Sequence, residues 1–501
     1  MKRAAGAAFA GLLIAAALPP LGWWPLAFVG VGLWGGVLVD LKWKSRLGVG
    51  FIVGLAHFVV SLAWVPEFTA PGYPVLVLLE TAFWTVASVL CRGRWAPLAL
   101  AGALTLAEAA RYNSPFEGLP LGGVDLGQVG GPFLAAARLG GGYAITLCVA
   151  LAGAALALAA ARRWVALGPA ALAVLIAVGG WLSPDGRSTG EPLRVAVVQG
   201  GGPVGFRGIE TDFDEVLDRH VEATEGIPAG SVDLVLWPEN AITESRDPTD
   251  LAVSPSGEGV LPPPSREALV VDRAVDRLGT LLVAGVVAPV GPDHFTNAAV
   301  AFVPGGARDG VLKAIRVPFG EYIPFRSLVD RVADLSAIPT EAIPGEGPGV
   351  LETREGKFAV SISYEVLFGQ RSREAVNLGG QVLLVPTNAA SFKRTQVPGQ
   401  ELAAARIRSV ETGRWVLQAA PTGYSAVVDH RGAVRQRTGI SEQAVLRDVV
   451  PRRSGSTPFL VTGPWPTLGL ALILVVGAAL AARRRPPPPS ENGTQLAWTD
   501  A

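Results

Sequence analysis

The sequence predicts a bundle of α-helices in a membrane and one α/β domain outside it. Half of the 501 residues are hydrophobic and only 17% are charged, a composition too apolar for a soluble enzyme of this length. Apolar runs long enough to span a bilayer lie before residue 183 and after residue 458. Between them, short β-rich segments alternate with amphipathic helical patterns, as in layered α/β domains.

The membrane part is predicted to contain eight spanning helices, because a span requires roughly 20 mostly apolar residues. The eight runs are approximately Ala4 to Leu18, Trp24 to Val39, Leu47 to Val65, Tyr73 to Cys91, Trp95 to Tyr112, Gly140 to Ala161, Trp164 to Leu182 and Phe459 to Ala482. A second apolar run directly follows the first, without a small-residue cleavage site, which favours a helix over a signal peptide. Residues 1–182 thus carry helices one to seven, 459–482 carry helix eight, and the proline-rich segment 483–501 is predicted to be a disordered tail.

Basic residues occur at the N-terminus and after every even-numbered helix, whereas the opposite loops contain almost none. They are Lys2, Arg3, Lys42, Lys44, Arg46, Arg92, Arg94, Arg162, Arg163, Arg483, Arg484 and Arg485. Because Lys and Arg are retained on the cytoplasmic side, both termini are predicted to be cytoplasmic and residues 183–458 extracytoplasmic. The formal net charge of the chain is zero, which gives no argument for nucleic-acid binding.

Two carboxylates, Glu80 and Glu108, fall inside predicted spans, where a charge is costly. They could mark a pathway through the membrane. In the alternative interpretation, which we favour, Glu108 caps a helix end near Arg111 and Glu80 faces a neighbouring helix.

The extramembrane segment from Leu193 to about Val450 is predicted to alternate strands with helices. The β-like runs are LRVAVVQ, LVLWPE, LLVAGVV, AAVAFV, GVLKAIRV, KFAVSISY, VLLVPTN, WVLQAA, SAVVD and AVLRDVV, and the helices fall near 211–224, 265–278 and 399–413. The two cysteines, Cys91 and Cys148, both lie in apolar runs outside this segment, which leaves it without a disulfide or a cysteine nucleophile. Its sequence contains no phosphate loop, zinc cluster or HExxH helix, so no cofactor or metal is predicted.

Three polar residues end β-like runs of this segment: Glu239 closes LVLWPE, Lys313 lies in GVLKAIRV, and Ser363 lies in KFAVSISY. The ends of strands are where an α/β sheet gathers its site. A carboxylate base, a lysine that stabilises an oxyanion and a nucleophile would together form an acyl-transfer site. The alternative for each residue alone is a solvated or capping side chain.

Five motifs of the segment extend this interpretation: WPEN, KAIRVPFGEYIP, SYEVLFG, TNAASF and ARIRSVETGRWV. With them, and with the eight-helix plan, nearly the whole chain resembles the apolipoprotein N-acyltransferase family. The outer domain of that family belongs to the carbon-nitrogen hydrolase (nitrilase) superfamily. The resemblance implies a nitrilase-like α-β-β-α sandwich for residues 183–458.

By matched position, the resemblance implies that Glu239 is the general base, that Lys313 stabilises the tetrahedral intermediate, and that Ser363 occupies the place of the nucleophile. It assigns supporting or substrate-binding roles to Glu321, Tyr364, Glu365 and Asn388. The family nucleophile is cysteine, whereas this chain has serine. The segments TNAASFK and QAAPTG also depart from the family pattern.

The function implied by the resemblance is lipoprotein N-acylation at a bacterial inner membrane. An acyl chain would pass from a phospholipid to the enzyme, and then to the α-amine of a diacylglyceryl-modified cysteine on a lipoprotein. The expected partners are therefore the phospholipid donor, the lipoprotein acceptor and membrane lipids. Two alternatives stay open: a non-catalytic relative that binds lipoproteins or lipids or scaffolds a membrane partner, and a membrane-tethered amidase.

Overall fold

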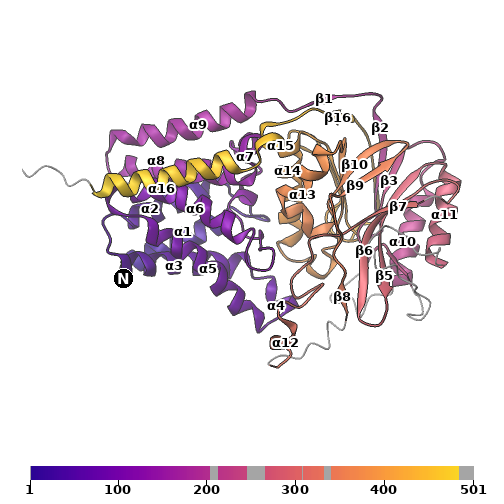
Figure 1. Cartoon of the computed structure of the whole chain (residues 1–501), viewed down its shortest axis with the longest axis horizontal. Coiled ribbons are helices and arrows are strands. Elements are labelled where there is room, and N and C mark those ends of the chain that lie inside the picture. The colour runs from indigo at the N-terminus through magenta and orange to yellow at the C-terminus, as the bar shows by residue number, and fades with distance from the viewer. Residues whose placement is uncertain (1, 203–212, 245–265, 307, 332–339, 484–501) are drawn as a thin grey trace, which may run out of the picture.

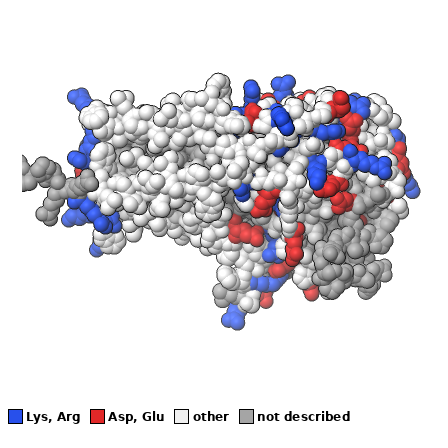
Figure 2. Space-filling model, turned by 45° about the horizontal axis from the view of Figure 1, so that its top comes forward, with Lys and Arg blue, Asp and Glu red and all other residues white. Residues whose placement is uncertain are grey.

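The chain folds into a bundle of long helices joined end to end with an α/β domain (Figure 1). The computed structural model describes residues 2–202, 213–244, 266–306, 308–331 and 340–483. The predicted disordered tail, apart from Arg483, lies outside these residues. Figure 2 shows an uncharged band around the helices, Lys and Arg at their far end, and charges of both signs over the α/β domain. This distribution is typical of a membrane protein with one large domain outside the bilayer.

Each of the eight predicted apolar runs forms a helix. The helices are α1 (Lys2–Ala16), α2 (Pro25–Val37), α3 (Trp43–Ser61), α5 (Gly72–Leu90), α6 (Ala96–Arg111), α8 (Gly142–Ala160), α9 (Leu167–Leu182) and α16 (Trp465–Arg483). Among the described residues, α3, α5, α8, α16 and the run that ends in α9 are long and apolar enough to cross a membrane. The helices α2 and α6 are shorter than the predicted runs, and α1 begins and ends two residues earlier than predicted. The chain leaves α1 just before Pro19 and Pro20, which cannot donate backbone hydrogen bonds.

Small residues let the helices approach closely, as expected for membrane helices. A Cβ atom placed on Gly102 of α6 would lie 2.1 Å from the Ala471 carbonyl oxygen of α16, and one on Gly11 of α1 would lie 2.3 Å from the Val53 carbonyl oxygen of α3. Larger side chains at either glycine would push the two helices apart.

A buried ionic cluster lies near the outer end of α5 and α6. Arg111 Nε lies 2.8 Å from Glu108 Oε1, and Arg111 Nη1 lies 3.1 Å from Glu80 Oε2. Trp84 Nε1 also donates to Glu108 Oε1 at 2.8 Å. All four side chains are buried. The favoured interpretation of Glu80 and Glu108 is therefore confirmed: Glu108 pairs with Arg111 and Glu80 reaches across to the neighbouring helix.

The same arginine fixes the loop that follows α6. Its guanidinium donates to the carbonyl oxygens of Leu119 and Leu121. Two neighbouring glycines of this loop contact the α/β domain: Gly118 O accepts from Tyr364 Oη at 2.7 Å, and Gly122 N donates to Gln400 Oε1 at 2.7 Å. The buried arginine thus sets where the α/β domain meets the helices.

The α/β domain contains two facing sheets. Among the described residues, the first has the order β15 (Ala444–Val450), β2 (Leu193–Gln199), β3 (Leu234–Leu236), β5 (Leu281–Val290), β6 (His294–Phe302) and β7 (Arg308–Leu312), with β4 (Ile242–Thr243) on β5 and β8 (Glu341–Ala342) on β6. The second has the order β14 (Val434–Arg437), β13 (Ala426–Val428), β12 (Val416–Ala419), β11 (Val382–Pro386), β10 (Gly356–Val360) and β9 (Val350–Thr353). The strands β2, β3 and β5 run parallel, as do β10, β11 and β12.

Helices cover the outer face of each sheet. Helices α10 (Phe213–Glu225) and α11 (Arg266–Leu278) pack on the first sheet, and α13 (Gly369–Asn377) and α14 (Val397–Thr412) pack on the second. Buried apolar side chains of both sheets form a core between them. This is the expected α-β-β-α sandwich. The core under α13 and α14 is continuous with that of the membrane helices, so the second sheet is the one that faces the bundle.

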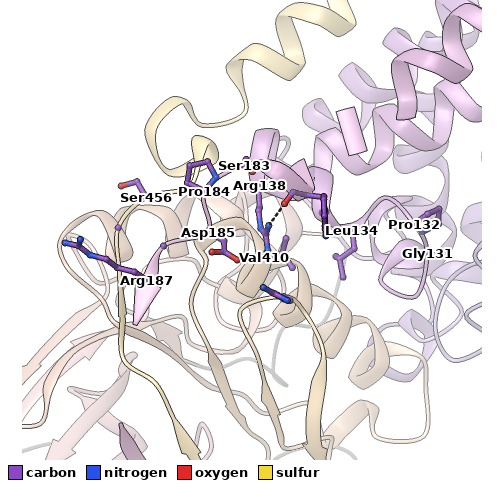
Figure 3. Close-up of a pocket in the computed structure, with 15 residues that line it drawn as sticks. Gly131, Pro132, Leu134, Arg138, Ser183, Pro184, Asp185, Arg187, Val410 and Ser456 are labelled. Carbon is purple, nitrogen blue, oxygen red and sulfur yellow. Dashed lines mark hydrogen bonds and ion pairs between the residues drawn. The ribbon is translucent and has the colours of Figure 1, made fainter. Parts of the chain in front are cut away.

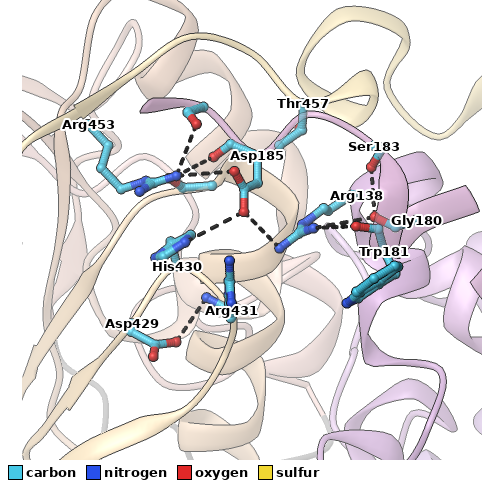
Figure 4. Close-up of polar contacts among 12 residues, drawn as sticks. Arg138, Gly180, Trp181, Ser183, Asp185, Asp429, His430, Arg431, Arg453 and Thr457 are labelled. Carbon is cyan, nitrogen blue, oxygen red and sulfur yellow. Dashed lines mark hydrogen bonds and ion pairs between the residues drawn. The ribbon is translucent and has the colours of Figure 1, made fainter. Parts of the chain in front are cut away.

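A second polar junction closes the opposite side of the contact (Figure 4). Asp185, which follows α9, pairs with Arg138 of α7 (Ala137–Gly140) at 3.1 Å and with Arg453 of β16 (Arg453–Ser454) at 3.3 Å. His430 Nε2 lies 3.5 Å from the same carboxylate. One aspartate thus joins the membrane helices to two segments of the α/β domain.

We expect Arg111→Met to destabilise the protein by about 3–5 kcal/mol, because it leaves two buried carboxylates without their cation. Unfolding of the purified protein in detergent would measure the loss. The matched control adds Glu80→Gln and Glu108→Gln to Arg111→Met, which removes the uncompensated charges and should restore part of the stability. Equal stability of Arg111→Met and the parent protein would contradict a structural role for the cluster.

Candidate active site

Three predicted residues lie at the ends of strands in the α/β domain. Glu239 follows β3, Lys313 follows β7, and Ser363 follows β10 at the start of a short 3-10 helix, Ser363–Leu367. Their exposed fractions are 4%, 3% and 6%. Parallel strands gather polar groups at their carboxyl ends, so the sheet topology brings Glu239 and Ser363 to the same edge of the sandwich.

Lys313 lies between two carboxylates. Its Nζ is 2.9 Å from Glu239 Oε1 and 2.8 Å from Glu321 Oε1. Burial alone would lower the pKa of Lys313, but the two carboxylates raise it above its ordinary value. The lysine is therefore a cation at neutral pH, and it can stabilise negative charge that develops on a substrate oxygen.

Asn297 on β6 completes this cluster, and the sequence motifs did not identify it. Its Nδ2 donates to Glu239 Oε1 at 2.8 Å and to Glu321 Oε1 at 3.2 Å. Its carbonyl oxygen accepts from Lys313 N at 2.8 Å. The available signal was an asparagine directly before the apolar run AAVAFV, which begins at Ala298.

Ser363 has a backbone φ of +51°, a conformation that side chains other than glycine adopt rarely. Among the described residues its hydroxyl bonds to Thr387 Oγ1, at 3.4 Å. The bonds of Glu239 and Lys313 run to each other, to Asn297 and to Glu321 instead. The serine is therefore beside the charged cluster without a hydrogen bond to it.

Thr387 follows β11, the strand next to β10, and is hydrogen-bonded to the buried carboxylate of Glu401. Its Oγ1 donates to Glu401 Oε1 at 3.2 Å. Burial and the nearby charge of Glu239 raise the pKa of Glu401 to about 8, although Thr387 and Lys313 act in the opposite direction. Neither Thr387 nor Glu401 was predicted, because no motif marks them and helix α14 brings Glu401 in from outside the sheet.

Glu365 and Tyr364 hold the segment around Ser363. Glu365 is fully buried; its Oε1 accepts from Ala314 N at 2.7 Å, and its Oε2 accepts from Ile362 N at 2.8 Å. This carboxylate ties the residue after Lys313 to the residue before Ser363. Tyr364 binds the membrane helices through Gly118, as described above.

Asn388 is the predicted residue that the structure does not bring into the cluster. Its Oδ1 accepts from Ala390 N at 3.1 Å, within its own turn. This is a local cap of the kind that asparagine forms in turns. Glu321, by contrast, lies in the cluster, and its second oxygen accepts from Val317 N at 2.8 Å.

Aromatic side chains of both parts of the chain meet beside the cluster. Phe116, in the loop after α6, lies 6.1 Å from Phe319 and 5.7 Å from Phe325, measured between ring centroids. On another side, Phe392 lies 5.1 Å from Trp64 and 6.3 Å from Phe68. Phe319 and Phe325 flank Glu321 in sequence and are exposed. The surroundings of the cluster are therefore apolar on the side of the membrane helices.

The arrangement suits acyl transfer through a covalent intermediate. It combines a serine hydroxyl at a sharp turn, buried carboxylates and a fixed cation, which are the groups that such a reaction requires. Among the described residues, no group of three or more His, Cys, Asp or Glu side chains could hold a metal ion.

Two family profiles match the chain. The family described as carbon-nitrogen hydrolase matches residues 194–456, and the apolipoprotein N-acyltransferase N-terminal domain matches residues 10–155. The first match ends within three residues of the predicted domain boundary at 458.

Relatives named apolipoprotein N-acyltransferase match over most of the chain. The protein from Mycolicibacterium smegmatis is 31% identical over 91% of this chain and 81% of its own length. That from Pseudomonas aeruginosa is 28% identical over 94% of both chains. Among solved structures, an amidase from Nesterenkonia sp. is 23% identical, with a TM-score of 0.37, over 54% of this chain and 94% of that one. A Saccharomyces cerevisiae protein of the nitrilase superfamily is 18% identical, with a TM-score of 0.38, over 53% and 93%.

Proposed function

Because the chain belongs to the apolipoprotein N-acyltransferase family, we propose that it transfers an acyl chain from a phospholipid to the α-amine of a diacylglyceryl-modified cysteine on a lipoprotein. The observation that carries the proposal is the buried cluster of Glu239, Lys313 and Glu321. Ser363 is linked to it through Thr387 to Glu401, on which the charges of Glu239 and Lys313 act. The cluster lies next to the membrane helices, where lipid substrates are available.

In the proposed reaction, Ser363 Oγ attacks the carbonyl carbon of a phospholipid ester. The tetrahedral intermediate collapses to an acyl-serine, and the lysophospholipid leaves with a proton. The amine of the lipoprotein then attacks the acyl-serine and restores the hydroxyl. Lys313 stabilises the oxyanion in both steps, and Glu239 is the general base. Asn297 and Glu321 hold the lysine in place.

The aromatic residues around the cluster support a lipid substrate. Phe319, Phe325 and Phe68 are exposed at the contact between the two parts of the chain. An acyl chain in the outer leaflet would meet apolar rings before it reaches the charged groups, so the substrate need not cross water.

The second candidate function is a non-catalytic member that binds lipoproteins or lipids. The observation that favours it is the serine at the nucleophile position, whose hydroxyl has no hydrogen bond to Glu239. Serine ionises far less readily than cysteine and depends more on a neighbouring base.

We expect membranes that contain the parent protein to convert a diacylated lipoprotein to the N-acylated form. The variants Glu239→Gln and Lys313→Met should each reduce this conversion at least a hundredfold. The first removes the general base, and the second removes the cation that stabilises the oxyanion. Mass spectrometry of the lipoprotein N-terminus measures the product. If the parent protein gives no N-acylated lipoprotein while it still binds the substrate, the non-catalytic candidate is favoured.

The variant Ser363→Cys should form the acyl-enzyme at least tenfold faster, because a thiolate is more populated and more nucleophilic at neutral pH. A tenfold gain corresponds to about 1.4 kcal/mol of activation free energy. The mass of the purified variant after incubation with phospholipid measures the adduct. Absence of an adduct in a folded Ser363→Cys protein would show that substrate positioning, rather than the nucleophile, is lacking.

We further propose that the protein lies in the bacterial inner membrane with its α/β domain outside the cytoplasm. Lys and Arg gather at the end of the bundle remote from that domain (Figure 2), as expected for a cytoplasmic end. A reporter fused after Leu182 should be active outside the cytoplasm, and one fused after Arg485 should be active inside. Protection of residues 183–458 from protease added to spheroplasts would contradict this orientation.

A further inference from the structure

A cavity of about 790 Å³ opens where α9 meets the α/β domain, at the junction built on Asp185 (Figure 3). Its lining comes from three places: the segment before α7, the chain that leaves α9, and the turns near Arg431 and Ser456. The predicted acyl-transfer residues are not among those that line it.

The charge of this cavity is positive. Arg138, Arg187 and Arg431 line it, and Asp185 is the one acidic residue of the lining. Asp185 is already paired with Arg138 and Arg453. Among the described residues, neither Arg187 nor Arg431 forms an ion pair, and both are exposed. The cavity therefore offers an anion two arginine side chains that form no ion pair among the described residues, from different sides of its lining (Figure 3).

The cavity lies at the outer end of a helix whose surface is apolar. Trp181 lines it and is 70% exposed, and Leu182, which follows, is 69% exposed. Further along α9, Val174, Leu175 and Val178 are also exposed. Tryptophan at the end of a spanning helix is typical of the headgroup level of a bilayer.

We propose that this cavity binds the phosphate of an anionic phospholipid whose acyl chains lie along α9. Arg187 and Arg431 contact the phosphate, and the lipid bridges the membrane helices and the α/β domain beside Asp185. Guanidinium groups bind phosphate oxygens in pairs, which gives specificity as well as affinity. The lipid at this site is a structural partner and is separate from the acyl donor at Ser363.

The test compares the full-length protein in nanodiscs of phosphatidylcholine with and without phosphatidylglycerol. We expect phosphatidylglycerol to raise the midpoint of thermal unfolding by several degrees, and Arg187→Gln with Arg431→Gln to remove most of this shift. The matched control, Arg273→Gln with Arg354→Gln, removes two exposed arginines of the α/β domain elsewhere and should keep the shift. The proposal would be overturned if phosphatidylglycerol raised the midpoint of thermal unfolding equally in the parent protein and in the variant Arg187→Gln with Arg431→Gln. A shift of the same size from inorganic phosphate in detergent would show a free-phosphate site and overturn the lipid assignment.

A separate observation concerns the serine. Ser363 Oγ, Thr387 Oγ1 and Glu401 Oε1 form a hydrogen-bonded row with spacings of 3.4 and 3.2 Å. All three side chains are buried. Thr387 Oγ1 is the donor in both contacts, and its single proton can serve only one of them at a time. When that proton is directed to Glu401, the threonine oxygen is left to accept the serine proton.

We propose that Thr387 and Glu401 form a relay that removes the proton of Ser363 when its oxygen attacks. The serine proton moves to Thr387 Oγ1 as the threonine proton moves to the Glu401 carboxylate. Glu401 returns this proton through Thr387 to the oxygen of the leaving lysophospholipid. Glu239 then takes the proton of the incoming amine and passes it to the serine oxygen as the acyl-serine breaks down. The relay rests on the proposed function, since it assigns Ser363 as the nucleophile. Two charged groups act on the pKa of Glu401: the carboxylate of Glu239 raises it, and the ammonium group of Lys313 lowers it.

The test uses a fluorophosphonate probe, which needs no lipid substrate: the Ser363 oxygen bonds to phosphorus, fluoride leaves, and the proton passes to the relay. We expect labelling of the parent protein to rise with pH through about 8, where Glu401 ionises. Glu401→Gln and Thr387→Val should lower the labelling rate at least tenfold and abolish this rise, whereas Thr387→Ser, which keeps a hydroxyl, should retain both. Unchanged labelling in Glu401→Gln, or no labelling of the parent protein at residue 363, would overturn the relay. The lipoprotein assay decides the proposed function independently of either result.

Discussion

The position of the α/β domain on the membrane helices depends on one buried guanidinium. Arg111 neutralises two carboxylates inside the bundle and holds the carbonyl groups of the loop that follows α6. Removing two or three charged groups from water is costly, and that cost is offset only when the geometry of the cluster is nearly complete. The loop therefore has one conformation, and its glycines present fixed partners to Tyr364 and Gln400. Since Tyr364 is the residue after Ser363, the same cluster fixes the position of Ser363 relative to the membrane helices.

Around Ser363, the carboxylates that pair with cations are different from the carboxylate that is hydrogen-bonded to Thr387. Glu239 and Glu321 share one lysine, so the cluster contains one more carboxylate than cations. Glu365 is balanced separately: it pairs with Arg371 at 3.2 Å, and its oxygens also accept from backbone amides on both sides of the site. Among the described residues around the serine, Glu401 is the buried carboxylate without a cation as hydrogen-bond partner. Burial, and then the charge of Glu239, raises its pKa. A cysteine would need little help from such a group, whereas a serine needs a proton acceptor within reach.

The sequence predicted most of the fold because its signals are local. Strand runs, helix patterns and basic loops are all read within a few residues, and the α-β-β-α order followed from the family resemblance. The membrane spans were overestimated for α2 and α6, where chain turns end the helix before the apolar run ends. In the site, Glu239, Lys313 and Glu321 could be identified because they lie in motifs. Asn297, Thr387 and Glu401 could not, because their roles arise from contacts between distant segments. Asn388 lay in a motif, yet its side chain serves its own turn.

The two junctions between the helices and the α/β domain are built differently, and the difference bears on what each can do. On the side of Tyr364, the contact is made by backbone carbonyls and aromatic rings, which leave an apolar approach to the nucleophile. On the side of Asp185, it is made by charged groups around a cavity with surplus arginines. The junction at Tyr364 suits a substrate that must enter and leave, because apolar rings contact an acyl chain without directional bonds. The junction at Asp185 suits an anion that stays bound, because a negative charge there neutralises arginines that lack an ion-pair partner. Because both junctions border the continuous core of α14 and the bundle, a change of packing at one would be transmitted to the other through side chains that are already in contact.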